Sequence, residues 1–262
     1  MTAHLAGSVV DVHCHIGELR GIWGMKRHTA RQHVAMMDAN GVHRSVVFSF
    51  CSGLLGHEDF VQANDRTAQA VSEFPDRLVG FAVVNPMFGE RATLEMERAS
   101  TRLGLLGLKL HPVLHGGYPI DSDLVTPILS CAESLRWPVL CHTDLNNQSA
   151  TPYRLVRVAR RFPSIRFIMA HMGIDPAFME ASLEEAVPVS NVSVDTSTIT
   201  DSPGIIKKAV RLLGEDRVLF GSDAPGLSME LSLRKVHLAS LDPDELQRVL
   251  GQNALALLGD SG

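Results

Sequence analysis

Histidine, lysine and aspartate residues stand at the ends of several short apolar segments of this chain. The residues concerned are His13, His15, Lys109, His142, His171 and Asp223. Imidazole and carboxylate groups without a thiolate suit a catalytic Zn²⁺, Mn²⁺ or Fe²⁺ ion better than a structural zinc of the cysteine type. The pattern therefore predicts a metal centre that activates water or a substrate.

The motif DVHCH places Asp11, His13 and His15 on one face of a strand, because alternate residues of a strand share a face. Two imidazoles so placed can bind one cation, and we expect His142 and Asp223 to complete the set. Each residue alone has an ordinary interpretation, such as a hydrogen-bonded histidine or an aspartate that caps a helix. The combination of five such segments favours the metal centre.

Eight short apolar segments are predicted strands, most of them apolar at both alternate positions. They span residues 8–15, 44–50, 78–85, 105–112, 138–143, 165–173, 192–197 and 217–224. Helical patterns occupy 57–74, 90–103, 152–162 and 204–213, and a last helix begins with the sequence Asp-Pro-Asp-Glu at 242–245.

Strands joined by connections of this length pair in parallel. Eight strand–helix repeats predict an α/β fold, a single (β/α)8 TIM barrel, with its active site at the C-terminal ends of the strands. We expect residues 1–262 to form one domain. An open doubly wound sheet is the alternative, but the sequence lacks the glycine-rich phosphate turn that would follow its first strand.

The order of the strand-end residues resembles that of the amidohydrolase superfamily, with HxH on the first predicted strand, Lys on the fourth, His on the fifth and sixth, and Asp on the eighth. The segments GLKLHP, LCHTD, AHMG and FGSDAP, and the closing stretch VLGQNALALLG, are similar to its amidohydrolase-related branch. That branch includes aminocarboxymuconate semialdehyde decarboxylase, resorcylate-type decarboxylases and lactone hydrolases. The resemblance extends from residue 9 to residue 259.

The resemblance implies a role for each of these residues. The matches to the primary metal ligands are His13, His15, His142 and Asp223. His171 matches a position that binds a second metal in two-metal members and serves as catalytic base or acid in one-metal members. Lys109 matches a lysine that is carboxylated and bridges two metals in some members. We expect one or two ions, one of them tightly held, with zinc favoured and manganese or iron as alternatives. Lys109 then either carries a carboxyl group or contacts an anionic substrate.

Two reactions are compatible with this site. The first is hydrolysis of a small amide, ester or lactone, in which the metal lowers the pKa of water from 15.7 toward about 7 and Asp223 carries the proton. The alternative is decarboxylation of a hydroxybenzoate- or muconate-like acid, with His171 or Asp223 as the proton donor. A third interpretation is a barrel without catalytic activity that binds a small molecule. It would not explain why every expected metal-binding residue is present. We expect His111, Trp23 and Arg20 to contact the substrate.

Other polar residues have less specific interpretations. Asp195, at the end of the seventh predicted strand, hydrogen-bonds either a ligand histidine or the substrate, or it caps the following turn. His115 lies in the turn HGGYP, where we expect a solvated side chain, and we assign His28 and His33 to the surface.

The composition excludes several classes of partner. A net charge of −5 and 5% aromatic residues provide no basic, base-stacking surface, so we expect no nucleic-acid partner. No apolar run approaches the roughly 20 residues of a membrane span, and the N-terminal sequence lacks the basic start of a secretory signal. We therefore expect a cytoplasmic protein with a small-molecule substrate and no membrane partner. Assembly into a homo-oligomer is compatible with the sequence.

Overall fold

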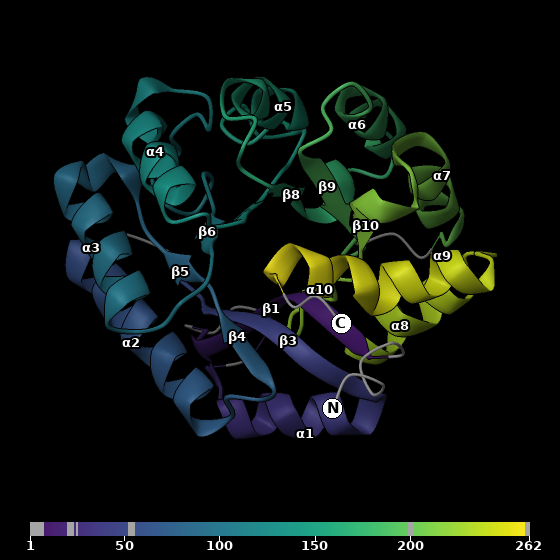
Figure 1. Ribbon diagram of the computed structural model, residues 1–262, viewed down its shortest axis with the longest axis horizontal. Helices are drawn as coiled ribbons and strands as arrows, with labels where there is room; N and C mark the ends of the chain where they lie inside the picture. The colour runs from purple at the N-terminus through teal and green to yellow at the C-terminus, as the bar shows by residue number, and fades with distance from the viewer. Residues whose placement is uncertain (1–7, 20–23, 25, 52–55, 199–201, 260–262) are drawn as a thin grey trace.

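A ring of strands surrounded by helices forms the body of the protein (Figure 1). This computed structural model describes residues 8–19, 24, 26–51, 56–198 and 202–259. The strands are β1 (Val9–Glu18), β2 (Arg27–His28), β3 (Val42–Ser49), β4 (Leu78–Gly80), β5 (Ala82–Val83), β6 (Leu108–Leu110), β7 (Val139–Cys141), β8 (Phe167–Met169), β9 (Val192–Asp195) and β10 (Val218–Leu219). Each of the eight predicted strands overlaps an observed one. The third is divided into β4 and β5, and β2 is an additional short strand antiparallel to β1.

The strands pair in parallel around the ring, as their long connections require. One sheet has the order β2-β1-β3-β4 and the other the order β10-β9-β8-β7-β6-β5. The chain itself joins them where β4 continues into β5. On the other side of the ring, β1 pairs with the residues that follow β10. There the Val12 N–H donates to the Phe220 carbonyl at 3.0 Å, and the Asp223 N–H donates to the His13 carbonyl at 2.9 Å. The closed (β/α)8 barrel is therefore confirmed, and the open sheet is wrong.

The helices are α1 (Ala30–Asn40), α2 (His57–Glu73), α3 (Glu90–Thr101), α4 (Thr126–Ser134), α5 (Pro152–Arg161), α6 (Met179–Ala186), α7 (Gly204–Leu213), α8 (Met229–His237), α9 (Pro243–Gln247) and α10 (Asn253–Leu258). Short 3-10 turns are η2 (Pro86–Phe88), η3 (Asp123–Val125), η4 (Ala170–Gly173) and η5 (Glu215–Arg217), and η6 (Arg248–Gln252) is a π-helical turn. The predicted helices correspond to α2, α3, α5, α7 and α9. The last begins with the expected capping box between Asp242 and Glu245.

Alternate residues of the strands face two different apolar layers. Leu140, Ile168 and Leu219 belong to a cluster with residues of β1 and β3, whereas Val139 and Phe167 pack in the larger cluster with the helices. Strands covered on both faces explain why the predicted strands are apolar at nearly every position.

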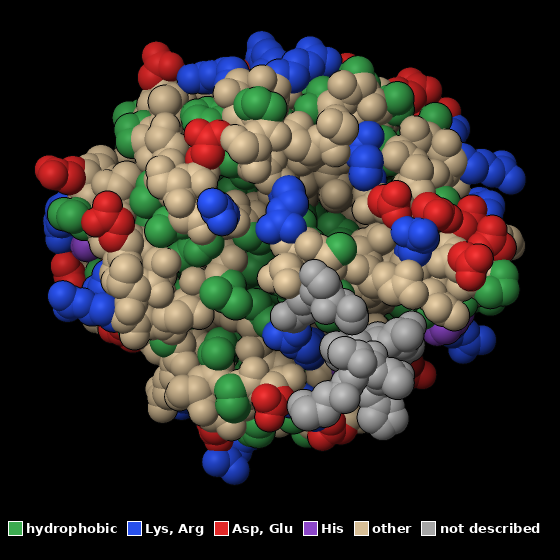
Figure 2. All heavy atoms as spheres, viewed as in Figure 1, with side chains coloured by type: hydrophobic (Ala, Val, Ile, Leu, Met, Phe, Trp, Pro, Cys, Tyr) green, Lys and Arg blue, Asp and Glu red, His purple; other side chains and the backbone are tan. Residues whose placement is uncertain are grey.

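Helix α10 and the turn η6, which joins it to α9, lie in front of the strand ring in Figure 1, and both contact β1. At Gly251, between these helices, a Cβ atom would lie 1.8 Å from the Ser8 carbonyl oxygen, so only glycine allows this approach. Figure 2 shows the same face, with basic and acidic side chains intermixed around its edge. This helical layer covers the N-terminal end of the barrel.

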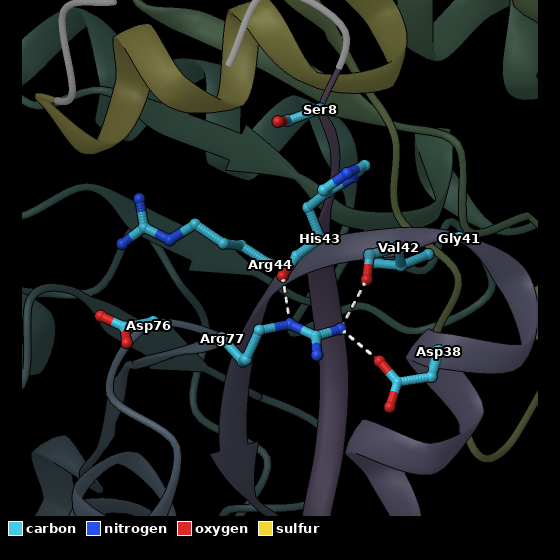
Figure 3. Close-up of a pocket in the computed structure, with 8 residues that line it drawn as sticks. All are labelled: Ser8, Asp38, Gly41, Val42, His43, Arg44, Asp76 and Arg77. Carbon is cyan, nitrogen blue, oxygen red and sulfur yellow. Dashed lines mark hydrogen bonds and ion pairs between the residues drawn. The ribbon is translucent and has the colours of Figure 1, made fainter. Parts of the chain in front are cut away.

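A pocket of about 640 Å³ also lies at this end, beside the beginning of β3 (Figure 3). Within it, the Arg77 guanidinium donates to the carbonyl oxygens of His43 at 2.7 Å and Val42 at 3.0 Å, and pairs with Asp38 at 2.8 Å. These bonds tie the chain before β4 to β3. Because active sites of TIM barrels form at the opposite end, we assign this pocket a structural role.

Candidate metal centre

Two imidazoles and one carboxylate meet where β1 lies beside the segment after β10. Oδ1 of Asp223 is 2.9 Å from Nε2 of His15 and 3.3 Å from Nε2 of His13. The ligand atoms of the three residues all lie within 4.8 Å of one another, and both imidazoles are buried. The register of β1 against β3 shifts between Asp11 and Cys14, so the regular alternation predicted for this strand is interrupted before His13.

The interruption separates Asp11 from the site. Its Oδ1 accepts the backbone N–H groups of His13 at 3.1 Å and Ser222 at 3.0 Å, and it belongs to neither group of potential ligands that the described residues form. The expectation that Asp11 shares a face with the two histidines is therefore wrong. Burial raises the pKa of Asp11 to about 6.

Hydrogen bonds hold His13 in the tautomer that a metal ligand requires. Its Nδ1–H donates to Oδ2 of Asp195, on β9, at 2.8 Å, which leaves the lone pair on Nε2. The Lys109 ammonium donates to that Nε2 at 3.0 Å. Burial, together with the positive charge of Lys109, lowers the pKa of His13 to about 3, so this ring is neutral at physiological pH.

Asp195 fulfils both roles that the sequence suggested. Besides binding His13, it accepts the backbone N–H of Ser197 at 3.1 Å and that of His171 at 2.9 Å through Oδ1. Burial alone would raise the pKa of Asp195, but the neighbouring His13 outweighs that effect and lowers it far below the usual range. Sequence reasoning did not identify Ser197, whose hydroxyl contacts Nδ1 of both His13 and His171.

Asp223 occupies a left-handed backbone conformation, with φ of 60°. Burial alone would raise its pKa, but the imidazoles of His13 and His15 outweigh burial and hold the pKa far below the usual range. The carboxylate is therefore ionised and directed at the two ring nitrogens. Non-glycine residues in this conformation are uncommon and concentrate at functional sites.

His171 lies just beyond the end of its strand. The predicted strand 165–173 ends at Met169, and His171 and Met172 both have left-handed backbones, with φ of 63° and 52°. The Nδ1–H of His171 donates to the Ser197 carbonyl at 2.7 Å, so Nε2 carries the lone pair of the neutral ring. Its ring centroid is 4.9 Å from that of His13, which brings the predicted acid–base residue beside the ligand cluster.

Lys109 is buried at the centre of the site, with 2% of its surface exposed. Burial lowers its pKa to about 8, and its Nζ lies 4.9 Å from the centre of the Phe48 ring. Carboxylation of lysine needs the neutral amine, and the lowered pKa increases its share, while the ammonium form still predominates at pH 7. A carboxylated Lys109 stays a prediction.

A model of the amidohydrolase family matches residues 10–259. The chain belongs to the amidohydrolase family. The superfamily recognised from the strand-end residues is thereby confirmed, and the chain is an enzyme of that superfamily. No curated protein sequence matches the chain significantly.

Solved amidohydrolase structures share the fold over nearly the whole chain. The 5-carboxyvanillate decarboxylase of Sphingomonas paucimobilis has a TM-score of 0.76 at 18% identity, covering 97% of this chain and 100% of its own. A dihydroxybenzoic acid decarboxylase of a Polaromonas species, with bound manganese and the inhibitor 2-nitroresorcinol, has a TM-score of 0.78 at 17% identity, covering 97% of both chains. A probable 2-pyrone-4,6-dicarboxylic acid hydrolase of Acinetobacter baumannii has a TM-score of 0.73 at 19% identity, covering 96% of this chain and 99% of its own.

The donor set of this amidohydrolase fits a divalent transition metal. Two buried imidazoles, one of them with its tautomer fixed by Asp195, and an ionised carboxylate are the ligands that Zn²⁺, Mn²⁺ and Fe²⁺ take in catalytic sites. The described residues form a second group, His13, His171 and Asp195, but hydrogen bonds inside the protein already engage Nδ1 of both imidazoles there. The group of His13, His15 and Asp223 is therefore the candidate metal site.

The predicted ligand His142 belongs to neither group. It lies in the same mouth, with its ring 5.1 Å from that of His171 and stacked on His111 at 3.9 Å with an interplanar angle of 12°. Its role as a fourth ligand stays a prediction, as does substrate contact by His111. Arg20 and Trp23 lie outside the described residues.

Three histidines assigned to solvent are buried. His28, His33 and His115 are 5%, 0% and 4% exposed, so these assignments are wrong. The rings of His33 and His28 contact each other at 3.3 Å, and Nε2 of His115 lies 3.2 Å from the Cys51 carbonyl oxygen. Histidine is a polar residue type, so the hydrophobic pattern of the sequence does not indicate that these three side chains are buried.

The amidohydrolase has no helix, within the part of the chain that the structure describes, that is long and apolar enough to cross a bilayer.

Proposed function

We propose that this amidohydrolase is a metal-dependent decarboxylase of a small hydroxylated aromatic or muconate-like carboxylic acid. One divalent ion, manganese or zinc, would be held by His13, His15 and Asp223, with His142 as a fourth ligand. This is the alternative reaction predicted from the sequence, and it replaces hydrolysis as the favoured one. A homo-oligomeric assembly, a cytoplasmic location and the absence of nucleic-acid and membrane partners remain expectations.

One observation carries the proposal: a buried ammonium group lies directly beside the candidate metal site. Lys109 Nζ is 3.0 Å from His13 Nε2, and the aromatic ring of Phe48 lies beside it. Burial disfavours the charged form of this lysine, and the carboxylates of Asp195 and Asp223 favour it. A substrate carboxylate beside Nζ would add a further anionic partner and would reach the metal ligands at the same time.

The structural relatives agree with a carboxylic acid substrate. Two of the three described above are decarboxylases of aromatic acids, and one of these contains manganese. The third is described as a hydrolase of a dicarboxylic acid.

The side chains of this chain supply binding and proton transfer. When bound, a divalent ion supplies positive charge for the acidic oxygen atoms of the substrate. Lys109 pairs with the carboxylate and orients it. His171, whose Nδ1–H is held by the Ser197 carbonyl, takes a proton from solvent on Nε2 and delivers it to the carbon that bears the carboxylate. The bond from that carbon to the carboxylate then breaks, its electron pair returns to the ring, and carbon dioxide leaves. A carboxylate and one proton thus give carbon dioxide and the protonated ring carbon.

Hydrolysis of a lactone is the second candidate, and the 2-pyrone-4,6-dicarboxylic acid hydrolase among the relatives favours it. The same groups would serve, since Lys109 could bind a carboxylate next to the lactone and Asp223 could accept the proton of a water molecule. The two reactions differ in their products: the first releases carbon dioxide, and the second adds water and creates a new carboxylate.

The test uses the purified chain loaded with Mn²⁺ or Zn²⁺ and three acids: 2,6-dihydroxybenzoate, 5-carboxyvanillate and 2-pyrone-4,6-dicarboxylate. The two benzoates carry ¹³C in the carboxylate. We expect metal-dependent release of ¹³CO₂ with an equal amount of the decarboxylated phenol, and loss of this activity in His171→Asn. Opening of the pyrone without carbon dioxide release, and no turnover of either benzoate, would establish hydrolysis instead.

A further inference from the structure

The Lys109 ammonium and a divalent ion need the same lone pair of His13. The imidazole of His13 is neutral, and its Nδ1–H donates to Oδ2 of Asp195 at 2.8 Å. The ring lone pair is therefore on Nε2, and the Lys109 ammonium donates a hydrogen bond to that atom at 3.0 Å. A metal binds histidine through the lone pair of a ring nitrogen, and neutral His13 has no second one. Metal binding by His13 therefore requires Lys109 to release Nε2.

The positive charge of Lys109 also acts on the other predicted imidazole ligands. Burial is the main cause of the lowered pKa of His13, His15 and His142, and the Lys109 ammonium contributes to each. A cation this close to the three rings also repels a divalent ion held by them. Lys109 thus opposes metal binding both as a hydrogen-bond donor and as a charge.

Few contacts hold the ammonium at His13. That hydrogen bond is the only one that it makes among the residues that the structure describes, so two of its three N–H donors are uncommitted there. Its other interactions are the ring of Phe48, whose centre is 4.9 Å away, and the charges of Asp195 and Asp223. The lysine stem is a flexible chain of four carbons. Release from His13 therefore costs one hydrogen bond and makes the ammonium available to an anion.

We propose that Lys109 couples metal binding to substrate binding: it competes with the metal for His13 and, once released, pairs with the substrate carboxylate. This inference rests on the proposed decarboxylase function, which supplies the carboxylate. An acid that attracts the ammonium frees Nε2 for the metal, and release of the ammonium on metal binding provides a partner for the acid. Each ligand then strengthens the binding of the other by the same factor. A carboxylated Lys109 would act in the opposite way, because it would be a negatively charged metal ligand.

The first test measures metal affinity in the absence of any acid. Lys109→Met removes both the donor and the charge, so it should bind Mn²⁺ about 10- to 100-fold more tightly than the native protein. Lys109→Gln loses the charge but keeps an N–H donor, and should bind more tightly by a smaller factor. Competition with a fluorescent chelator at pH 7 measures the affinities. Lys207→Met, on α7, is the control and should match the native protein.

This first test has one contrary outcome. Unchanged or weaker Mn²⁺ binding in either folded Lys109 variant overturns the competition for His13, and weaker binding would identify Lys109 as a metal ligand. The result does not depend on any substrate, so it is independent of which reaction the enzyme catalyses.

The second test measures the coupling. Calorimetric titration gives the affinity for 2,6-dihydroxybenzoate with and without saturating Mn²⁺. We expect Mn²⁺ to tighten binding of this acid in the native protein, and to do so by a factor at least about 5-fold smaller in Lys109→Met. An equal effect of Mn²⁺ in both proteins overturns the coupling, while binding of the acid to the metal-loaded protein preserves the proposed function. Failure of the metal-loaded native protein to bind the acid overturns the proposed function and the coupling together.

Discussion

Asp195 accepts the Nδ1–H of His13 at 2.8 Å, and its second oxygen accepts the backbone N–H of His171 at 2.9 Å. One buried carboxylate on β9 therefore positions a candidate metal ligand on β1 and the candidate proton donor after β8. A carboxylate in this position also makes the imidazole a stronger ligand, because it stabilises positive charge on the ring.

Asp195→Asn should weaken binding of Mn²⁺ or Zn²⁺ by about 10- to 100-fold, the usual effect of removing a carboxylate behind a ligand histidine. The amide keeps nearly the same shape but loses the charge. Competition with a fluorescent chelator measures the affinity, and Asp38→Asn, at the opposite end of the barrel, is the matched control. Unchanged affinity in Asp195→Asn would show that His13 does not bind the metal through Nε2.

The sequence predicted the strand ends well, because apolar runs and the residues that terminate them are local features. His13, His15, Lys109, His171 and Asp223 all lie in one mouth, as expected from the topology of a parallel barrel. Because all strands of a parallel barrel end at the same rim, residues at the ends of distant strands come together there.

The sequence did not predict features that depend on contacts between strands. The left-handed backbone of His171 accompanies hydrogen bonds to Asp195 and Ser197, both of which lie 24 or more positions away. The shift of register in β1 depends on its pairing with β3. His33 is buried beside His28, and the hydrophobic pattern of the sequence does not indicate burial of either polar side chain.

If the chain is a hydrolase in which Asp223 accepts the proton of water, Asp223→Asn should retain most of the bound metal and lose turnover by roughly 100- to 10,000-fold, the range expected when a group that handles a proton is removed. Asparagine tolerates the left-handed backbone of this position, so the fold should be unaffected. Metal content and kcat are measured on the same preparation. His13→Ala should behave in the opposite way and lose metal first. A near-normal kcat in Asp223→Asn would exclude this carboxylate from the reaction.

Lys109→Met should lower kcat/KM for a carboxylate substrate by about 10- to 100-fold, the contribution expected of a hydrogen bond to a charged group. Methionine fills the buried space of the lysine stem without its charge. Metal analysis before and after the change also tests carboxylation: an unmodified lysine leaves the metal content at one ion per chain, whereas a bridging carbamate requires a fall from two. Lys207→Met, on α7, is the control and should change neither quantity.

Gly251→Ala should destabilise the fold by at least about 1–3 kcal/mol, because the new methyl group would overlap the Ser8 carbonyl and force α10 away from β1. Gly204→Ala, in the first turn of α7, is the matched control. Its nearest neighbour would be 3.7 Å away, so this change should be neutral or stabilising by up to about 1 kcal/mol. Urea unfolding measures both. Equal stabilities would mean that the C-terminal helices contribute little to closing the barrel.

The buried pair of His28 and His33 should make the protein sensitive to acid. Burial, together with the neighbouring His28, lowers the pKa of His33 to about 3, whereas an unfolded histidine has a pKa of about 6.5. Between these values the unfolded chain binds a proton that the folded chain does not, so stability is lost as the pH falls below about 6.5. One such proton changes the free energy of unfolding by up to about 1.4 kcal/mol per pH unit. His33→Gln should reduce this slope between pH 6.5 and pH 4 in urea titrations of the metal-free protein. His237→Gln, which removes an exposed imidazole at the end of α8, should leave the slope unchanged. A slope that is identical in His33→Gln and the native protein would assign the acid sensitivity to the histidines of the metal centre instead.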